Sequence, residues 1–162
     1  MKAVTIKQLK DELSHKSTNE LKELCLHLSR FKKENKELLT YLLFEAHNEE
    51  YYIESIKELM DELFEDSNTK NYFFIRKSMR KILTQVKKYI RYSKKKVTET
   101  ELLLYYCKKM KNFYPPIDQS IRLQSVFEGQ VRMIRKAIDK LHEDLQYDYQ
   151  LELENLLNEN EY

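Results

Sequence analysis

Apolar residues recur at spacings of three and four along most of the chain, which is the pattern of helices that pack by one face. In the first half, the pattern predicts helices over residues 6–13, 21–31, 38–46 and 53–64. A polar stretch separates the last two segments between His47 and Glu50. We therefore expect one kinked helix or a broken pair of helices there, with a joint near Asn48.

The second half begins after a polar turn at residues 66–69. The spacing then predicts helices over residues 74–90, 102–110, 123–145 and 151–157. Pro115 and Pro116 end the second of these, because a proline disfavours helical geometry in the residue before it. Gly129 costs helix stability in the middle of the 123–145 segment, so we interpret it as the mark of a close helix crossing.

Polar residues that accept hydrogen bonds from backbone N–H groups predict where several helices begin. Residues 17–20 and 98–101 each start with Ser or Thr and end with Glu, the pattern of a capping box. Thr5 and Asp118 are candidate single caps, and Asn35 is expected to interrupt the helix that precedes it.

Composition supports the same fold class. The 162 residues include one Gly and two Pro, too few for the turns of a sandwich or barrel or for a Gly-rich phosphate loop. We predict an all-α fold of six to eight helices, either a single irregular bundle or a stack of helix pairs. Residues 1–157 are expected to form one domain and residues 158–162 a polar tail.

The sequence contains no motif typical of an enzyme active site. The four His residues fall in different predicted helices, and only Glu12 and His15 have the spacing of a di-iron ligand pair. HExxH, GxSxG and P-loop motifs are absent from the sequence. We therefore predict a protein that is not an enzyme, with no catalytic residues, no metal site, no cofactor and no small-molecule substrate.

The sequence also bears on location. Its longest uncharged stretch, residues 38–44, is far shorter than the roughly 20 residues that span a bilayer. The start of the chain is charged and unlike a signal peptide. Cys25 and Cys107 lie in apolar helical patterns without metal spacing, so we predict two reduced core residues of a cytoplasmic protein that does not bind membranes.

Acidic and basic residues are grouped in separate blocks along the sequence, although the net charge is only +2. Residues 45–66 hold nine acids and one base, residues 67–98 hold eleven bases and no acid, and residues 143–162 hold seven acids and no base. On a helix, the bases of the middle block share an arc of about 120°, opposite its apolar side chains. We call this set the basic stripe: Lys77, Arg80, Lys81, Lys87, Lys88, Arg91 and Lys95.

The basic stripe has two main interpretations; a third, a helix lying on a membrane surface, is disfavoured because the core needs its apolar side. Acidic helices of the same chain can cover it, because surface ion pairs select packing partners even where each pair is weak. Alternatively, it can contact the phosphates of a nucleic acid, with Tyr92 beside it to stack on an exposed base. We favour the first interpretation and keep nucleic-acid binding as the alternative.

Two stretches of the chain resemble known helical sequences. Residues 5–13 and 21–28 are similar to a SAP motif, a helix–loop–helix unit that binds DNA. Residues 9–14, 19–21 and 33–38, followed by 103–106, 117–118 and 125–128, resemble a bacterial all-helical family catalogued as a domain of unknown function. The second resemblance implies a helical bacterial cytoplasmic domain and carries no activity. We predict a helical protein-interaction module whose partner is another protein or a second copy of itself.

Overall fold

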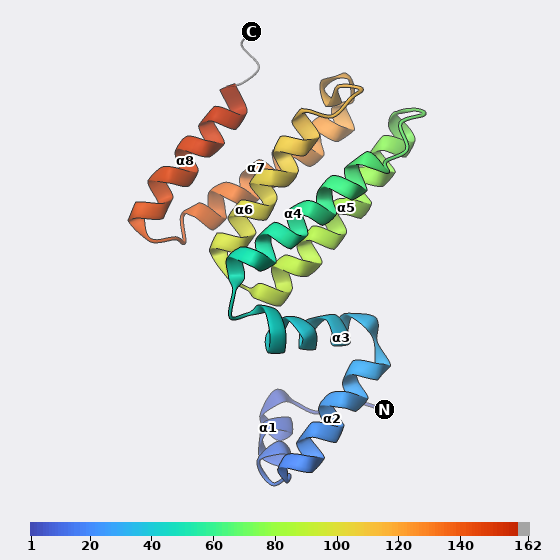
Figure 1. Ribbon diagram of the computed structural model, residues 1–162, viewed down its shortest axis with the longest axis vertical. Helices are drawn as coiled ribbons and strands as arrows, with labels where there is room; N and C mark the ends of the chain where they lie inside the picture. The colour runs from blue at the N-terminus through green and yellow to red at the C-terminus, as the bar shows by residue number, and fades with distance from the viewer. Residues whose placement is uncertain (159–162) are drawn as a thin grey trace. The chain divides into compact units, whose positions relative to one another are not determined.

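The computed structural model describes residues 1–158, in which the regular elements are helices joined by short loops and no strand is present (Figure 1). The eight α-helices are α1 (Ile6–Ser14), α2 (Thr18–Phe31), α3 (Lys33–Thr40), α4 (Glu49–Glu65), α5 (Tyr72–Ser93), α6 (Lys96–Lys111), α7 (Ile121–Ile138) and α8 (Glu143–Asn158). A π-helical turn, Tyr41–Glu45, follows α3, and a 3-10 turn, Ile117–Gln119, precedes α7. The predicted all-α fold with six to eight helices is confirmed.

Where the sequence predicts one domain over residues 1–157, the helices cluster into two compact units. The first is Met1–Phe44, and the second begins at Glu45. No residue of α1, α2 or α3 is buried, because three short helices cannot enclose a core. Of the predicted polar tail, Asn158 is the last residue of α8, and residues 159–162 lie outside the described part of the chain.

Several predicted helix boundaries of the first unit are confirmed. Thr5 and Ser17 each cap a helix with the full reciprocal pattern of a capping box, in which Gln8 and Glu20 reach back to the cap backbone. The predicted interruption at Asn35 is displaced, since the break lies at Lys32 and Asn35 is inside α3. The Asn35 amide instead donates to the Leu28 carbonyl at the end of α2, 2.8 Å away.

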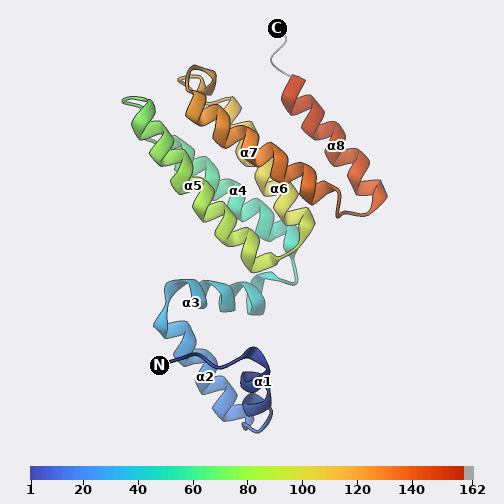
Figure 2. The ribbon, with the colours of Figure 1, turned by 180° about the vertical axis from the view of Figure 1, so that it is seen from behind.

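The second unit is built around α6, which packs against α4, α5, α7 and α8. The predicted joint near Asn48 and the turn at residues 66–69 are both present, and α4 and α5 form an antiparallel hairpin (Figures 1 and 2). The largest fully buried side chains include Met60, Ile75, Met79, Leu102, Leu103, Tyr106, Met110, Leu123, Ile134 and Ile138. Within this core, the Tyr106 hydroxyl of α6 donates to the Met79 carbonyl of α5 at 2.9 Å.

The predicted capping box at residues 98–101 is wrong. Helix α6 begins earlier, at Lys96, because the left-handed backbone of Lys94 (φ 59°) ends α5 abruptly. Thr98 is therefore fully buried inside α6, and its hydroxyl donates to the Glu49 carboxylate.

The predicted long helix over 123–145 is two helices. α7 ends at Ile138 and α8 begins at Glu143, although the apolar spacing continues through the break. Gly129 does not mark a close crossing, because a Cβ there would meet only the Arg132 side chain at 3.9 Å. Asp118 does not cap α7, whose N-cap residue is Ser120.

Candidate nucleic-acid interface

The basic stripe lies on the outer side of α5, a helix that packs against α4 and α6. The opposite side of α5 is buried through Ile75, Met79, Ile82, Leu83 and Val86, as the apolar spacing predicts. Its Asn71 cap accepts hydrogen bonds from two backbone N–H groups and fixes the start of the helix. Six residues of the stripe belong to α5, whereas Lys95 is the N-cap residue of α6.

Most of the basic stripe is open to solvent. Lys77, Arg80, Lys81, Arg91 and Lys95 are exposed, and Lys87 and Lys88 are half-buried. Five of the seven cations form no ion pair with any residue from 1 to 158; these are Lys77, Arg80, Lys81, Lys87 and Arg91.

The other two residues of the stripe have partners. The Lys95 ammonium lies 2.8 Å from a carboxylate oxygen of Glu49. The Lys88 ammonium lies over the Tyr89 ring, 4.9 Å from the ring centroid. The predicted matching of base with acid is thus present at Lys95 and absent from the five open cations.

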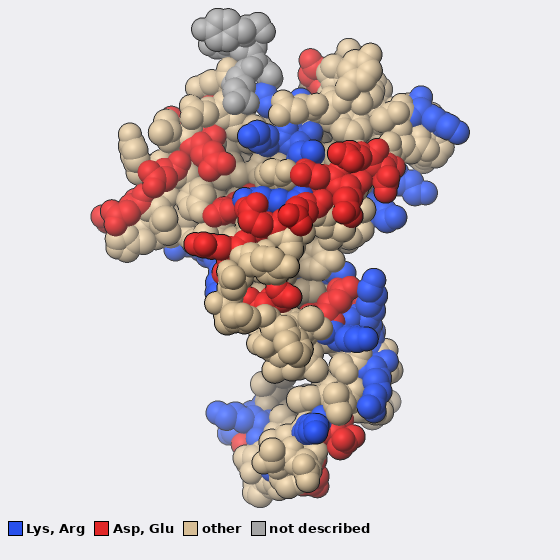
Figure 3. Space-filling view, viewed as in Figure 1, with Lys and Arg blue, Asp and Glu red and all other residues tan. Residues whose placement is uncertain are grey.

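Further ion pairs of α4 lie within α4 or join it to α6. Asp61 pairs with Lys109 at 2.8 Å, and Lys57 bridges Glu54 and Glu101 at 2.7 and 3.1 Å. Other acidic side chains of α4 are exposed, and Figure 3 shows acidic groups gathered over α4 and α8. The stripe stays open because α4 packs against the buried side of α5, away from these cations.

The structure changes which aromatic residue accompanies the stripe. Tyr92, expected beside it, is buried and contacts the Tyr89 ring, with centroids 6.0 Å apart. Phe73 is 59% exposed and lies one turn before Lys77, in phase with the stripe. The sequence spacing of Phe73 and Lys77 could have placed both on one side of the helix, but only if α5 is known to begin as early as Tyr72.

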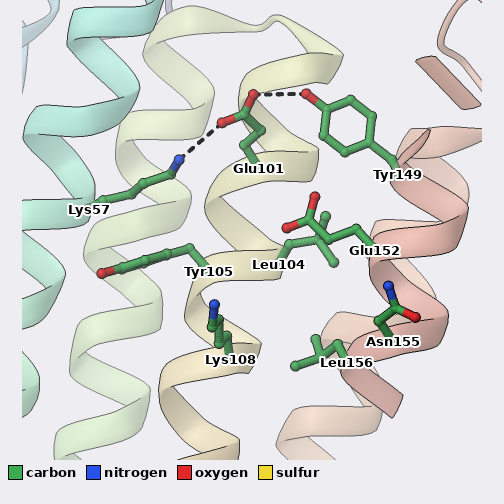
Figure 4. A pocket seen from close by; sticks show the side chains of 9 residues that line it. All are labelled: Lys57, Glu101, Leu104, Tyr105, Lys108, Tyr149, Glu152, Asn155 and Leu156. Carbon is green, nitrogen blue, oxygen red and sulfur yellow. Dashed lines mark hydrogen bonds and ion pairs between the residues drawn. The ribbon is translucent and has the colours of Figure 1, made fainter. Parts of the chain in front are cut away.

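A polar pocket of about 530 Å³ lies between α4, α6 and α8 (Figure 4). Inside it, Glu101 accepts hydrogen bonds from Lys57 and, at 2.8 Å, from the Tyr149 hydroxyl. Burial acts to lower the pKa of Lys57, but hydrogen bonds to Glu54 and Glu101 outweigh it and raise that pKa. Burial, together with the bond to Glu101, raises the pKa of Tyr149. At neutral pH Lys57 therefore stays charged and Tyr149 neutral, so both groups act as links between helices.

The two cysteines differ in their surroundings. Cys107 is buried in α6 as predicted, and burial raises the pKa of its thiol to about 12. The prediction of a core position for Cys25 is wrong, because α2 exposes its apolar side. Both thiols are free.

Over residues 1–158, no group of three or more His, Cys, Asp or Glu side chains is arranged to hold a metal ion. Two of the four histidines stand at helix ends: His15 is the C-cap residue of α1, and His142 accepts from the Asp144 N–H at the start of α8. None of the described helices has the length and apolar character needed to cross a membrane.

Comparison of the chain with protein-family models, with curated proteins and with solved structures found no match. Both resemblances, to the SAP motif and to the bacterial helical family, therefore stay predictions.

Proposed function

We propose that this chain is a non-enzymatic binding module that contacts nucleic acid through the basic stripe of α5. The observation that carries the proposal is the set of five exposed or half-exposed cations without an acidic partner in residues 1–158. The sequence favoured coverage of this stripe by acidic helices, and that coverage is absent at these five positions. An open row of cations on one rigid helix suits the phosphate backbone of a nucleic acid.

The dimensions of the stripe support this proposal. From Lys77 to Arg91 the helix rises about 21 Å, so its cations can neutralise several successive phosphates. Each neutralised phosphate releases condensed counter-ions, and this release supplies affinity without reading sequence. We therefore expect binding that depends strongly on salt and weakly on base sequence.

Charge reversal tests the proposal. The variant K77E/R80E/R91E should lose binding to a labelled oligonucleotide at low salt, measured by fluorescence anisotropy. The matched control R122E/R132E/K136E makes the same change in net charge on exposed positions of α7 and should keep binding. Equal losses in the two variants would mean that total charge, not the stripe, governs binding, and the proposal would be wrong.

Protein binding through residues 1–44 is a second candidate function. Helices α1 and α2 each carry an apolar stripe at spacings of three and four that the first unit leaves exposed. Its members are Ile6, Leu9, Leu13, Leu24, Leu28 and Phe31. Exposed apolar patches of this kind mark protein interfaces, and most soluble assemblies join copies of one chain. The partner we propose for this patch is a second copy of this chain.

Sedimentation equilibrium tests the second candidate. The wild type should form dimers, and L24E/L28E should shift them to monomers because two charges would enter the apolar contact. The control K22E/R30E changes two exposed residues of α2 outside the apolar stripe and should leave the dimers intact. A monomeric wild type would contradict this candidate function and leave the nucleic-acid proposal untouched.

A further inference from the structure

The basic stripe ends at an exposed aromatic ring. Phe73 lies in the first turn of α5, one turn before Lys77, and presents its ring to solvent on the same side as the cations. Most large aromatic side chains of the second unit are at least half-buried, so a Phe at this position needs an explanation beyond core packing. The rise along the axis of α5 from Phe73 to Arg91 is about 27 Å.

The ring is held in place from several directions. The Asn71 carboxamide oxygen accepts from the Phe73 and Phe74 N–H groups at 3.0 and 3.2 Å, which fixes the backbone below the ring. The Phe74 ring meets it edge to face, with centroids 5.4 Å apart and an interplanar angle of 83°. The Arg76 guanidinium lies 5.6 Å from its centroid. Because these contacts orient the ring before any ligand arrives, little conformational freedom is lost on stacking.

We propose that the basic stripe takes single-stranded nucleic acid in preference to duplex, with Phe73 as the platform on which an unpaired base stacks beside Arg76. This inference rests on the proposed function and specifies its ligand. Surfaces for single strands combine cations that follow the backbone with aromatic rings that stack on bases. In a duplex the base faces are already stacked, so Phe73 would gain nothing there without unstacking a base step.

The test compares a labelled oligodeoxythymidine strand with a mixed-sequence duplex of the same length, at one low salt concentration. Phe73→Ala should weaken binding of the single strand about tenfold and change duplex binding less than about twofold. Phe73→Tyr keeps an aromatic face and should retain most of the affinity for the single strand. Tyr51→Ala removes an equally exposed ring from α4 and serves as the matched control, with no change expected for either ligand.

The outcomes separate the two proposals. Equal effects of Phe73→Ala on both ligands, or no effect on either, would overturn the stacking platform while the stripe itself could still bind. Absence of wild-type binding to both ligands would overturn the proposed function and this inference with it. Thermal unfolding of each variant followed by circular dichroism shows that the compared proteins are folded.

Discussion

The Lys95 ammonium lies 2.8 Å from Glu49, so this member of the basic stripe is held by the first turn of α4. The same carboxylate accepts hydrogen bonds from the Ser93 hydroxyl and from the Thr98 hydroxyl, the latter at 2.5 Å. Glu49 thereby ties the start of α4 to the end of α5 and the first turn of α6. Because of this contact, Lys95 belongs to the basic stripe but not to the five open cations that we expect to neutralise phosphates.

Removing Glu49 and removing Lys95 should destabilise the fold to different extents. Glu49→Leu should lower the free energy of unfolding by about 1–3 kcal/mol, because the buried Thr98 hydroxyl loses its acceptor. Lys95→Ala should cost below about 1 kcal/mol, since the ammonium is exposed and the ion pair is solvated. Urea unfolding of both variants measures the difference. Equal costs would show that the ion pair, not the hydroxyl contacts, supplies the stabilisation.

The two cysteines should differ in how quickly they react with a thiol reagent in the native protein. Cys25 is exposed and should react quickly with a disulfide reagent in the native protein. Cys107 is buried with a raised thiol pKa, so it should react only after denaturant is added. The expected count is one thiol per chain in buffer and two in denaturant. Rapid labelling of Cys107 in buffer would contradict the packing of α6.

Helix α7 supplies a matched pair of substitutions. Ile134 is 0% exposed, and Ile134→Asp should cost several kcal/mol and unfold the second unit, because an uncompensated charge would enter the core. Ile121 lies on the same helix and is 84% exposed, so Ile121→Asp should leave the melting temperature within a few degrees. Similar melting of the two variants would refute the assignment of the buried side of α7.

Alkaline pH should destabilise the second unit. Burial, and then its hydrogen bond to Asp61, raise the pKa of Tyr105 from 10.0 to about 12. The unfolded chain therefore loses this proton at a lower pH than the folded chain. As a result, the free energy of unfolding falls as the pH rises from 10.0 to about 12. Urea midpoints measured across this pH range should decline less steeply in Tyr105→Phe than in the wild type. Identical slopes would show that the raised pKa of Tyr105 contributes nothing.

The sequence predicted local features more reliably than long-range ones. Thr5 and Ser17 cap their helices because capping needs only residues within one turn. Thr98 has the same local pattern, yet the left-handed Lys94 sets the start of α6 and tertiary packing buries Thr98. The break between α7 and α8 was missed because Leu141 and Leu145 keep the helical spacing across it, with no Gly or Pro to mark the end.

The candidate site was predicted in part. Helical phase alone placed Lys77, Arg80 and Arg91 on one side of α5, opposite its core residues. Whether acidic helices cover that side depends on which face of α5 meets α4, and periodicity within single helices does not determine this. Phe73 was missed, and Tyr92 was misplaced, because neighbouring helices decide which ring at the edge of an apolar face is buried.

The most direct test of the central claim is the salt dependence of binding to a single-stranded oligonucleotide. If the five open cations each neutralise one phosphate, the logarithm of the association constant should fall against the logarithm of salt concentration with a slope of about −3.5. In K77E/R80E/R91E the remaining slope should be far shallower. A wild-type slope near zero, or one that K77E/R80E/R91E leaves unchanged, would contradict nucleic-acid binding by the basic stripe.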